Sequence, residues 1–171
     1  MPAVPERLRW AVETIAVQPD DEVLEIGCGG GVSAALVCER LEAGRMLAID
    51  RSTTQIERAR RRNAAHVAAG RLELETVDVA DLDVGARRFD TVFAVNVNVF
   101  WLAPARQELE RIRGALSPGG TLFLFYETPS ATRAEEAAEG VARALAGAGF
   151  AGPDLLRLGP TMLSCVSRPE G

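Results

Sequence analysis

Apolar and polar positions along this chain alternate between two periodicities, one typical of helices and one typical of strands. Near the N-terminus, Leu8, Val12 and Ile15 are spaced four and three residues apart, which predicts an amphipathic helix after Pro5. Shorter and denser apolar runs predict strands over residues 22–26, 46–49, 72–75, 89–95, 121–126, 155–158 and 162–166. Longer segments with helical spacing predict helices over residues 32–41, 52–70, 104–116 and 132–145.

Two of the predicted strands differ in how their polar residues are distributed. Residues 72–75 alternate leucine with glutamate, which suits a strand exposed on one face at the edge of a sheet. Residues 89–95 are apolar at most positions, which suits a central strand buried on both faces. The pattern therefore predicts where each strand lies within the sheet.

Polar and turn-forming residues mark the expected ends of several elements. Ser52 or Thr53 is placed to cap the helix that follows the second strand. Thr132 and Glu135 form a capping box for the last helix. The run 117–120, Ser-Pro-Gly-Gly, predicts a turn before the fifth strand.

Strands that alternate with helices predict a doubly wound α/β fold, a mostly parallel seven-stranded sheet in a three-layer α/β/α arrangement. The last two strands are separated by Gly159-Pro160-Thr161 and are expected to form a C-terminal hairpin that adds an antiparallel strand. The sequence contains no repeat, low-complexity tract or linker. We therefore expect residues 1–171 to form a single domain.

The composition limits the partners and the cellular location to be expected for this protein. The chain has a net charge of −5, and its nineteen basic residues are all arginine, so no nucleic-acid partner is expected. No run of eighteen apolar residues predicts a membrane span, and residues 1–9 do not resemble a secretory signal. Three widely spaced cysteines, Cys28, Cys38 and Cys165, fit neither a disulfide framework nor a metal site and favour a cytoplasmic location.

The strongest chemical signal is a glycine cluster directly after the first strand. Glycine occupies every second position at Gly27, Gly29 and Gly31. The helix that follows this cluster points its N-terminus at the same edge of the sheet. Val32 stands where a dinucleotide-binding motif has its third glycine. Asp50, at the end of the second strand, is placed to accept hydrogen bonds from a ribose diol. These residues indicate an adenosine-type ligand without separating a nicotinamide cofactor from S-adenosylmethionine.

A resemblance to a known family, which covers most of the chain, separates these two cofactors. Residues 23–31 resemble the signature glycine motif of class I S-adenosylmethionine-dependent methyltransferases, and Asp50-Arg51-Ser52 resembles their second-strand motif. Residues 77–79, 89–92 and 116–120 resemble the family's third motif, its fourth strand and the turn before its fifth. The terminal hairpin is similar to the family's extra antiparallel strand.

The resemblance implies S-adenosyl-L-methionine as cofactor. The residues it implies for cofactor binding are Glu25, Gly27, Cys28, Gly29, Asp50, Arg51, Gln55, Asp78, Val79 and Asn96. Among them, Asp50 would bind the ribose hydroxyls, Asp78 would face the adenine amino group, and Glu25 would organise the glycine loop and the cofactor's ammonium group. Arg51 and Gln55 would flank the adenine, and no metal is implied.

The methyl acceptor is expected beside the residues that follow the fourth strand. Asn98 and Trp101 are candidates to orient it, although Trp101 is equally suited to packing on the core. Glu127, at the end of the fifth strand beside Tyr126, is the one obvious carboxylate base. Trp10 on the first helix is more typical of packing than of a lid.

Departures from known methyltransferase subclasses narrow the range of methyl acceptors to be expected. Val97 follows Asn96 in place of the two prolines and aromatic residue of adenine and glutamine amide methyltransferases. The sole histidine, His66, lies in the helix after the second strand, where a surface role is expected rather than that of a general base. The leading hypothesis is a methyltransferase for a small molecule. A non-catalytic cofactor-binding subunit that supports a partner is the alternative, and a homodimer is left open.

Overall fold

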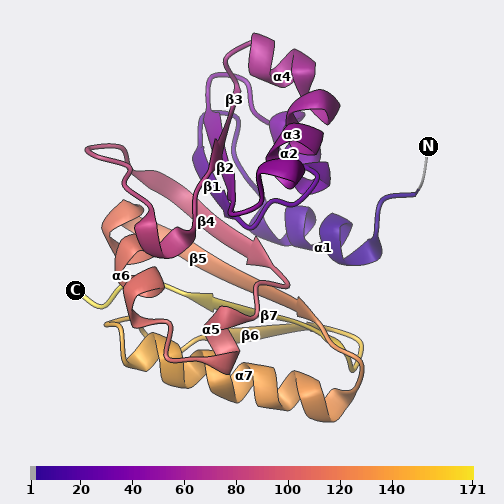
Figure 1. The fold of residues 1–171 in the computed structure, drawn as a ribbon. Helices are drawn as coiled ribbons and strands as arrows, with labels where there is room; N and C mark the ends of the chain where they lie inside the picture. Colours follow the sequence, from indigo (N-terminus) through magenta and orange to yellow (C-terminus); the bar gives the residue numbers. More distant parts are fainter. Residues whose placement is uncertain (1–2) are drawn as a thin grey trace.

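The computed structural model describes residues 3–171, which form one seven-stranded sheet with helices on both faces (Figure 1). The strands are β1 (Glu22–Ile26), β2 (Arg45–Asp50), β3 (Leu72–Thr76), β4 (Phe89–Val95), β5 (Leu116–Glu127), β6 (Asp154–Leu158) and β7 (Met162–Ser167). The helices are α1 (Glu6–Ile15), α2 (Val32–Cys38), α3 (Thr53–Arg62), α4 (Ala64–Ala68), α5 (Val99–Leu102), α6 (Arg106–Ala115) and α7 (Ala131–Ala146), with a 3₁₀ turn η1 (Val79–Asp81).

The strand order places the ligand-binding edge of the sheet. It runs β3-β2-β1-β4-β5-β7-β6, and only β7 is antiparallel to its neighbours, β5 and β6. The order reverses between β1 and β4, so a crevice opens beyond the carboxyl ends of these two strands. The predicted fold class is confirmed, as are the edge position of β3, the central position of β4 and the terminal hairpin.

Each face of the sheet has its own apolar core. On one face, α1, α2 and α3 cover side chains that include Met46, Phe93 and Phe125. On the other, α5, α6 and α7 cover side chains that include Phe89 and Leu122. These two cores produce the predicted three layers, and all three cysteines are buried.

Two predicted boundaries are wrong for identifiable reasons. The helix expected over 52–70 breaks at Asn63, whose buried side-chain amide donates to the backbone oxygens of Gly31 and Ala59. The capping box on Thr132 does not form, because Ser130 caps α7 and accepts from the Arg133 backbone N–H. The cap predicted at Ser52 is confirmed by its bond from the Gln55 N–H.

Two further elements differ from prediction. Residues 117–120 form no separate turn, since β5 already pairs with β4 at Leu116 and bulges before the ladder resumes at Thr121. The residues after β4, for which no helix is predicted, include the short helix α5 with Phe100 and Trp101.

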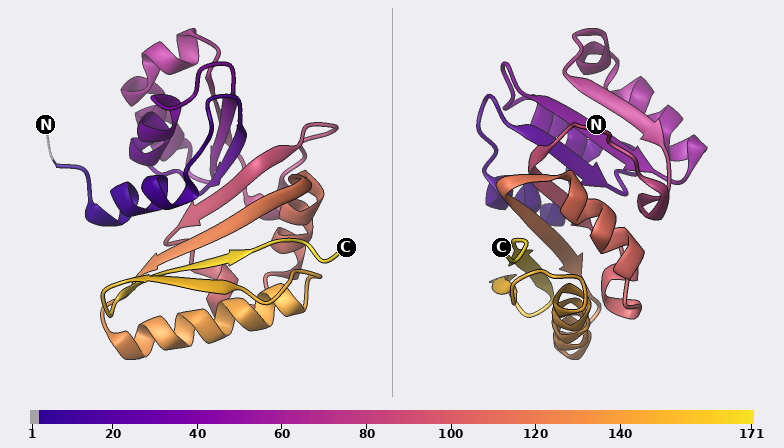
Figure 2. Two further views of the ribbon diagram at one scale, coloured as in Figure 1. Left: turned by 180° about the vertical axis from the view of Figure 1, so that it is seen from behind. Right: turned by 90° about the vertical axis from the view of Figure 1, so that its left-hand side faces the viewer.

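One end of the sheet remains exposed. All five residues of the edge strand β6 are exposed, including Leu155, Leu156 and Leu158. Figure 2 shows the β6–β7 hairpin in yellow at this edge, with α7 running along it. Within residues 3–171, no helix has both the length and the apolar composition needed to cross a membrane.

Candidate active site

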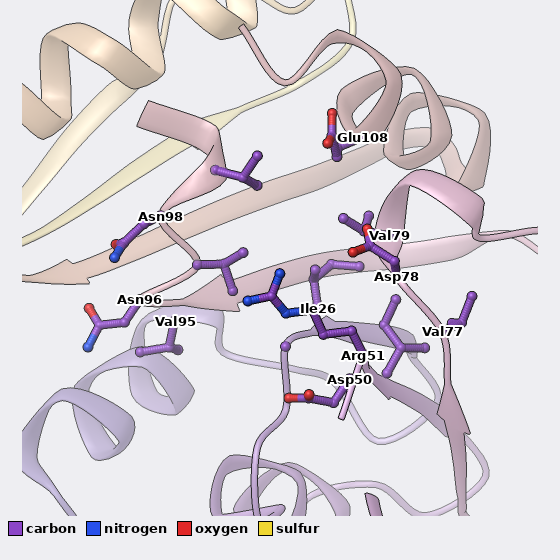
Figure 3. Close-up of a pocket in the computed structure, with 14 residues that line it drawn as sticks. Ile26, Asp50, Arg51, Val77, Asp78, Val79, Val95, Asn96, Asn98 and Glu108 are labelled. Atoms are coloured by element: carbon purple, nitrogen blue, oxygen red, sulfur yellow. The ribbon is translucent and has the colours of Figure 1, made fainter. Parts of the chain in front are cut away.

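A cavity of about 540 Å³ lies beyond the carboxyl ends of β1, β2 and β4. Its volume is within the range of small-molecule sites. The polar residues that line it are Asp50, Arg51, Asp78, Asn96, Asn98 and Glu108. Its apolar and glycine lining comprises Ile26, Gly27, Ile49, Val77, Val79, Val95, Val97 and Val99. Figure 3 shows Asp50, Asp78 and Glu108 on different elements around this space, with Asn96 and Asn98 following the end of β4.

The glycine turn after β1 forms one wall of the cavity and depends on the absence of side chains. Gly27, Gly29 and Gly31 all have positive φ, at +70°, +53° and +76°. A Cβ on Gly27 would lie 2.7 Å from Val97 Cγ2, so a side chain there would push against the segment after β4. The turn therefore brings its backbone close to the end of β4.

Asp50 connects this turn to the start of α3. Its Oδ2 accepts from the Gly29 backbone N–H at 2.9 Å, and its Oδ1 accepts from the Ser52 N–H at 2.9 Å. The carboxylate is half-buried and lines the cavity. Since a carboxylate has about four acceptor positions, Asp50 retains capacity for hydroxyl donors of a ligand.

A second group of acids lies on the η1 side of the cavity. Asp78 caps η1 and accepts from the Ala80 N–H at 3.0 Å. Glu108, on α6, lines the same cavity and is half-buried. The sequence pattern does not predict Glu108 as a lining residue, although a helix that starts at this edge of the sheet has its first turns beside the cavity.

Glu25 lies behind the glycine turn and not on the cavity wall. Its side chain is buried at 2% exposure, and Oε1 accepts from the Ser33 hydroxyl. Burial raises the pKa of Glu25 to about 7, the hydrogen bond from Ser33 opposes the rise, and the charge of Asp50 adds to it. Its Oε2 has no hydrogen-bond partner among the described residues.

The end of β4 contributes two asparagines. Asn96 has φ +56°, a conformation that asparagine tolerates better than most residues. Its Oδ1 accepts from the Glu127 backbone N–H at 2.8 Å. Asn98 Oδ1 accepts from the Trp101 indole N–H at 3.1 Å. Both residues line the cavity.

The comparisons with known proteins agree with this geometry. The family model described as a methyltransferase domain matches residues 23–120, more than half of the chain and all of the cavity-lining residues. The chain belongs to this family. This membership confirms the predicted resemblance to the class I S-adenosylmethionine-dependent methyltransferases.

Among curated proteins, this chain is 37% identical over 129 residues to a carboxy-S-adenosyl-L-methionine synthase from Pseudomonas syringae pv. tomato. That match covers 72% of this chain and 51% of the relative. It is 32% identical over 112 residues to the protein of the same name from Salmonella arizonae, covering 63% and 44%. The chain thus spans about half the length of the curated relatives it matches.

Solved structures show the same fold. A SAM-dependent methyltransferase from Aquifex aeolicus aligns with a TM-score of 0.79 and 16% identity, covering 94% of this chain and 88% of that one. The CcbJ methyltransferase from Streptomyces caelestis aligns with a TM-score of 0.75 and 18% identity, covering 99% of both chains.

Two residues that the resemblance implied for cofactor binding lie outside the cavity, as do His66 and Trp10, for which no role in the site was expected. Gln55 and Cys28 belong to the surrounding turns and do not line it, and the Cys28 thiol is turned toward the Gly29 carbonyl. His66 is half-buried on α4. Trp10 packs edge-on against Phe125, with ring centroids 5.4 Å apart.

Glu127, the residue expected to act as a base, also lies outside the cavity. Glu127 forms a salt bridge of 3.1 Å with Arg7 of α1 and does not line the cavity. The Tyr126 hydroxyl donates to the Val97 carbonyl at 3.0 Å, and burial raises the pKa of this phenol well above its usual value. Trp101 is turned toward Arg133 of α7, so of the three acceptor candidates the structure brings only Asn98 into the cavity.

Proposed function

We propose that this protein transfers a methyl group from S-adenosylmethionine to a small-molecule acceptor. The observation that carries the proposal is one cavity, at the reversal point of the sheet, in which Asp50 and Asp78 lie across from the asparagines that follow β4. Acceptor groups on one side suit the ribose hydroxyls and adenine amino group of the cofactor. The open opposite side leaves room for a second molecule.

The described residues fit this cofactor. Asp50 and Asp78 would hold its adenosine half, with Arg51 and Val79 beside the adenine, and the backbone of Gly27 would meet its methionine half. When bound, S-adenosylmethionine supplies a methyl group already activated by the sulfonium sulfur, for in-line transfer. The protein then has mainly to align the acceptor, which is a large part of catalysis in such reactions.

The proposed reaction does not assign Glu127 as a free base. Its carboxylate is paired with Arg7, and the Tyr126 hydroxyl is bonded to Val97. We therefore expect an acceptor that reacts without proton removal by these two side chains, with Asn98 orienting it.

The test is incubation of the protein with S-adenosylmethionine carrying a deuterated methyl group and a library of small metabolites, followed by mass spectrometry. The proposal predicts a labelled acceptor together with S-adenosylhomocysteine. The Asp50→Ala variant should form neither. A folded protein that binds S-adenosylhomocysteine yet labels no acceptor would contradict the proposed activity.

A second candidate function follows from the curated relatives, which are named carboxy-S-adenosyl-L-methionine synthases. In that case the cofactor itself would be the molecule modified. The same mass spectra separate the two activities, because a carboxylated form of the cofactor would appear in place of a labelled acceptor and S-adenosylhomocysteine.

The exposed β6 strand favours a third candidate, a non-catalytic subunit that binds the cofactor and supports a partner protein. Three exposed leucines on an edge strand are a typical site for strand pairing. Sedimentation of the purified chain tests it. An active monomer would contradict this candidate, whereas an inactive chain that binds the cofactor and gains activity only with a co-purified partner would support it.

A further inference from the structure

Residues 96 and 97, which we name the β4 corner, are fastened to the end of β5 by three hydrogen bonds. The Asn96 backbone N–H donates to the Phe125 carbonyl at 2.8 Å, and the Glu127 N–H donates back to Asn96 Oδ1 at 2.8 Å. The Tyr126 hydroxyl donates to the Val97 carbonyl at 3.0 Å. Three consecutive residues of β5 therefore hold two consecutive residues that line the cavity.

The backbone of the β4 corner has a conformation that these bonds help to maintain. Asn96 has φ +56°, in the left-handed region, which is less favourable than helical or extended backbone for a residue with a side chain. Such residues persist where their surroundings hold them, and they cluster at functional sites. Both bonds of Asn96 join it to β5, so this strand opposes relaxation of the corner.

The β4 corner also meets the glycine turn after β1. Val97 is half-buried and lines the cavity, and a Cβ on Gly27 would lie only 2.7 Å from its Cγ2. The Gly27 backbone and the Val97 side chain are therefore within van der Waals reach of each other. A change in the position of Val97 would alter the wall that the two residues form together.

Tyr126 supplies the only one of the three bonds that comes from a side chain of β5. Its ring lies in the apolar core at 3% exposure, and packing alone does not require the hydroxyl, since Phe123 and Phe125 occupy the same strand. A buried hydroxyl is unfavourable unless it is hydrogen-bonded, and its partner here is the Val97 carbonyl. Burial raises the pKa of Tyr126 well above its usual value, so the hydroxyl keeps its proton and remains a donor.

We propose that Tyr126 is a positioning residue for the methionine half of the cofactor, because its hydroxyl holds Val97 against the glycine turn. This inference rests on the proposed methyltransferase function, in which the backbone of Gly27 meets that half. The turn and the β4 corner then have their arrangement before the ligand arrives. A wall formed in advance binds more tightly than one that has to be ordered on binding.

The adenosine side of the cavity is held by other bonds. Asp50 accepts from the N–H groups of Gly29 and Ser52, and Asp78 accepts from that of Ala80. None of these bonds involves β5. Loss of the phenol hydroxyl should therefore affect the methionine half of a ligand and leave the adenosine half unaffected.

Calorimetric titration with two ligands measures the effect on each half. S-adenosylhomocysteine carries both halves, whereas 5′-methylthioadenosine lacks the amino-acid group. We expect Tyr126→Phe, which keeps the ring, to weaken S-adenosylhomocysteine about fivefold and to leave the affinity for 5′-methylthioadenosine unchanged.

The matched control removes another buried hydroxyl that donates to a backbone carbonyl. Ser167 on β7 is 4% exposed, does not line the cavity, and donates to the Ala151 carbonyl at 2.6 Å. Ser167→Ala should lower the free energy of unfolding and change neither affinity. This variant separates loss of a buried hydrogen bond in general from loss of the bond to the β4 corner.

Hydrogen exchange measures the β4 corner directly. In the free protein, the Asn96 and Glu127 N–H groups should exchange about fivefold faster in Tyr126→Phe than in the wild type, since both belong to the bonds of the corner. Saturation with S-adenosylhomocysteine should reduce this difference, because the bound ligand then holds the corner. Ser167→Ala should exchange these two protons as the wild type does.

Several results would overturn the inference. Unchanged S-adenosylhomocysteine affinity or unchanged exchange in Tyr126→Phe would show that the hydroxyl does not position the β4 corner. Equal weakening of both ligands, or the same selective loss in Ser167→Ala, would show a general loss of structure. Failure of the proposed function is distinguishable, because the folded wild-type protein itself would then not bind S-adenosylhomocysteine.

Discussion

At the scale of single residues, Glu25 is an ionisable group placed where water does not reach. It lies beneath the glycine turn with one oxygen bonded to Ser33 and the other without a partner among the described residues. Burial raises its pKa from 4.5 to about 7, so the folded state holds the proton to a higher pH than the unfolded state does. The stabilisation of the folded state by this protonated carboxyl group is fully present below about pH 4.5 and is lost as the pH rises to 7.

Glu25→Gln should remove this pH dependence. Between pH 4.5 and 7, the free energy of unfolding should fall in the wild type relative to the variant. At pH 8 we expect the variant to be more stable by on the order of 2 kcal/mol, because the neutral amide need not be ionised. Urea unfolding at several pH values measures this, with Glu75→Gln, exposed on β3, as control. If the unfolding free energies of the wild type and Glu25→Gln changed in parallel with pH, the assignment of this pH dependence to Glu25 would be wrong.

Gly31 is a position where both conformation and space exclude a side chain. It has φ +76°, and a Cβ would lie 2.8 Å from Ala59 Cβ and 2.6 Å from Asn63 Nδ2. Gly70 has φ +68° but nothing within 4 Å. We expect Gly31→Ala to lower the unfolding free energy by about 3 kcal/mol and Gly70→Ala by about 1 kcal/mol, since only the first adds overpacking to backbone strain. Equal losses of unfolding free energy in Gly31→Ala and Gly70→Ala, measured with urea, would show that contact with Ala59 and Asn63 adds nothing to the backbone strain.

At the scale of elements, the packing of α5 on α7 determines how the cavity is completed. Gly140 and Gly114 both lie inside helices, but only Gly140 meets another backbone, that of Trp101. Gly140→Ala should therefore lower stability by about 2 kcal/mol, whereas Gly114→Ala should raise it by about 0.5–1 kcal/mol through helix propensity. Thermal unfolding of both variants is the measurement. Stabilisation by Gly140→Ala would mean that α5 lies farther from α7 than described.

The sequence predicts elements better than it predicts where side chains beyond the strand ends point. Periodicity identified the edge strand, the central strand and the hairpin, because burial on each face dictates those patterns. The directions of Trp101 and Glu127 depend instead on Arg133 and Arg7, which are distant in sequence. Glu108 was missed for the same reason, since its place in the cavity follows from how α6 packs beside η1.

At the scale of the whole molecule, the two halves of the sheet have separate tasks. All residues that line the cavity lie between Ile26 and Glu108, within the matched methyltransferase domain. The part from β5 onward supplies α7, which packs on α5, and the hairpin, whose strand β6 is the exposed edge of the sheet. The first half thus provides the groups proposed for the cofactor, and the second half holds α5, which follows the segment proposed to face the acceptor.

The most direct test of the account is calorimetric titration of the purified protein with S-adenosylhomocysteine, with NAD as the control ligand. We predict saturable binding of S-adenosylhomocysteine and none of NAD. Asp50→Ala should weaken the affinity roughly a hundredfold, as the loss of two charge-assisted hydrogen bonds implies, while Asp20→Ala at an exposed position should not. Absence of binding by the folded wild type, or unchanged affinity in Asp50→Ala, would contradict the cofactor site described above.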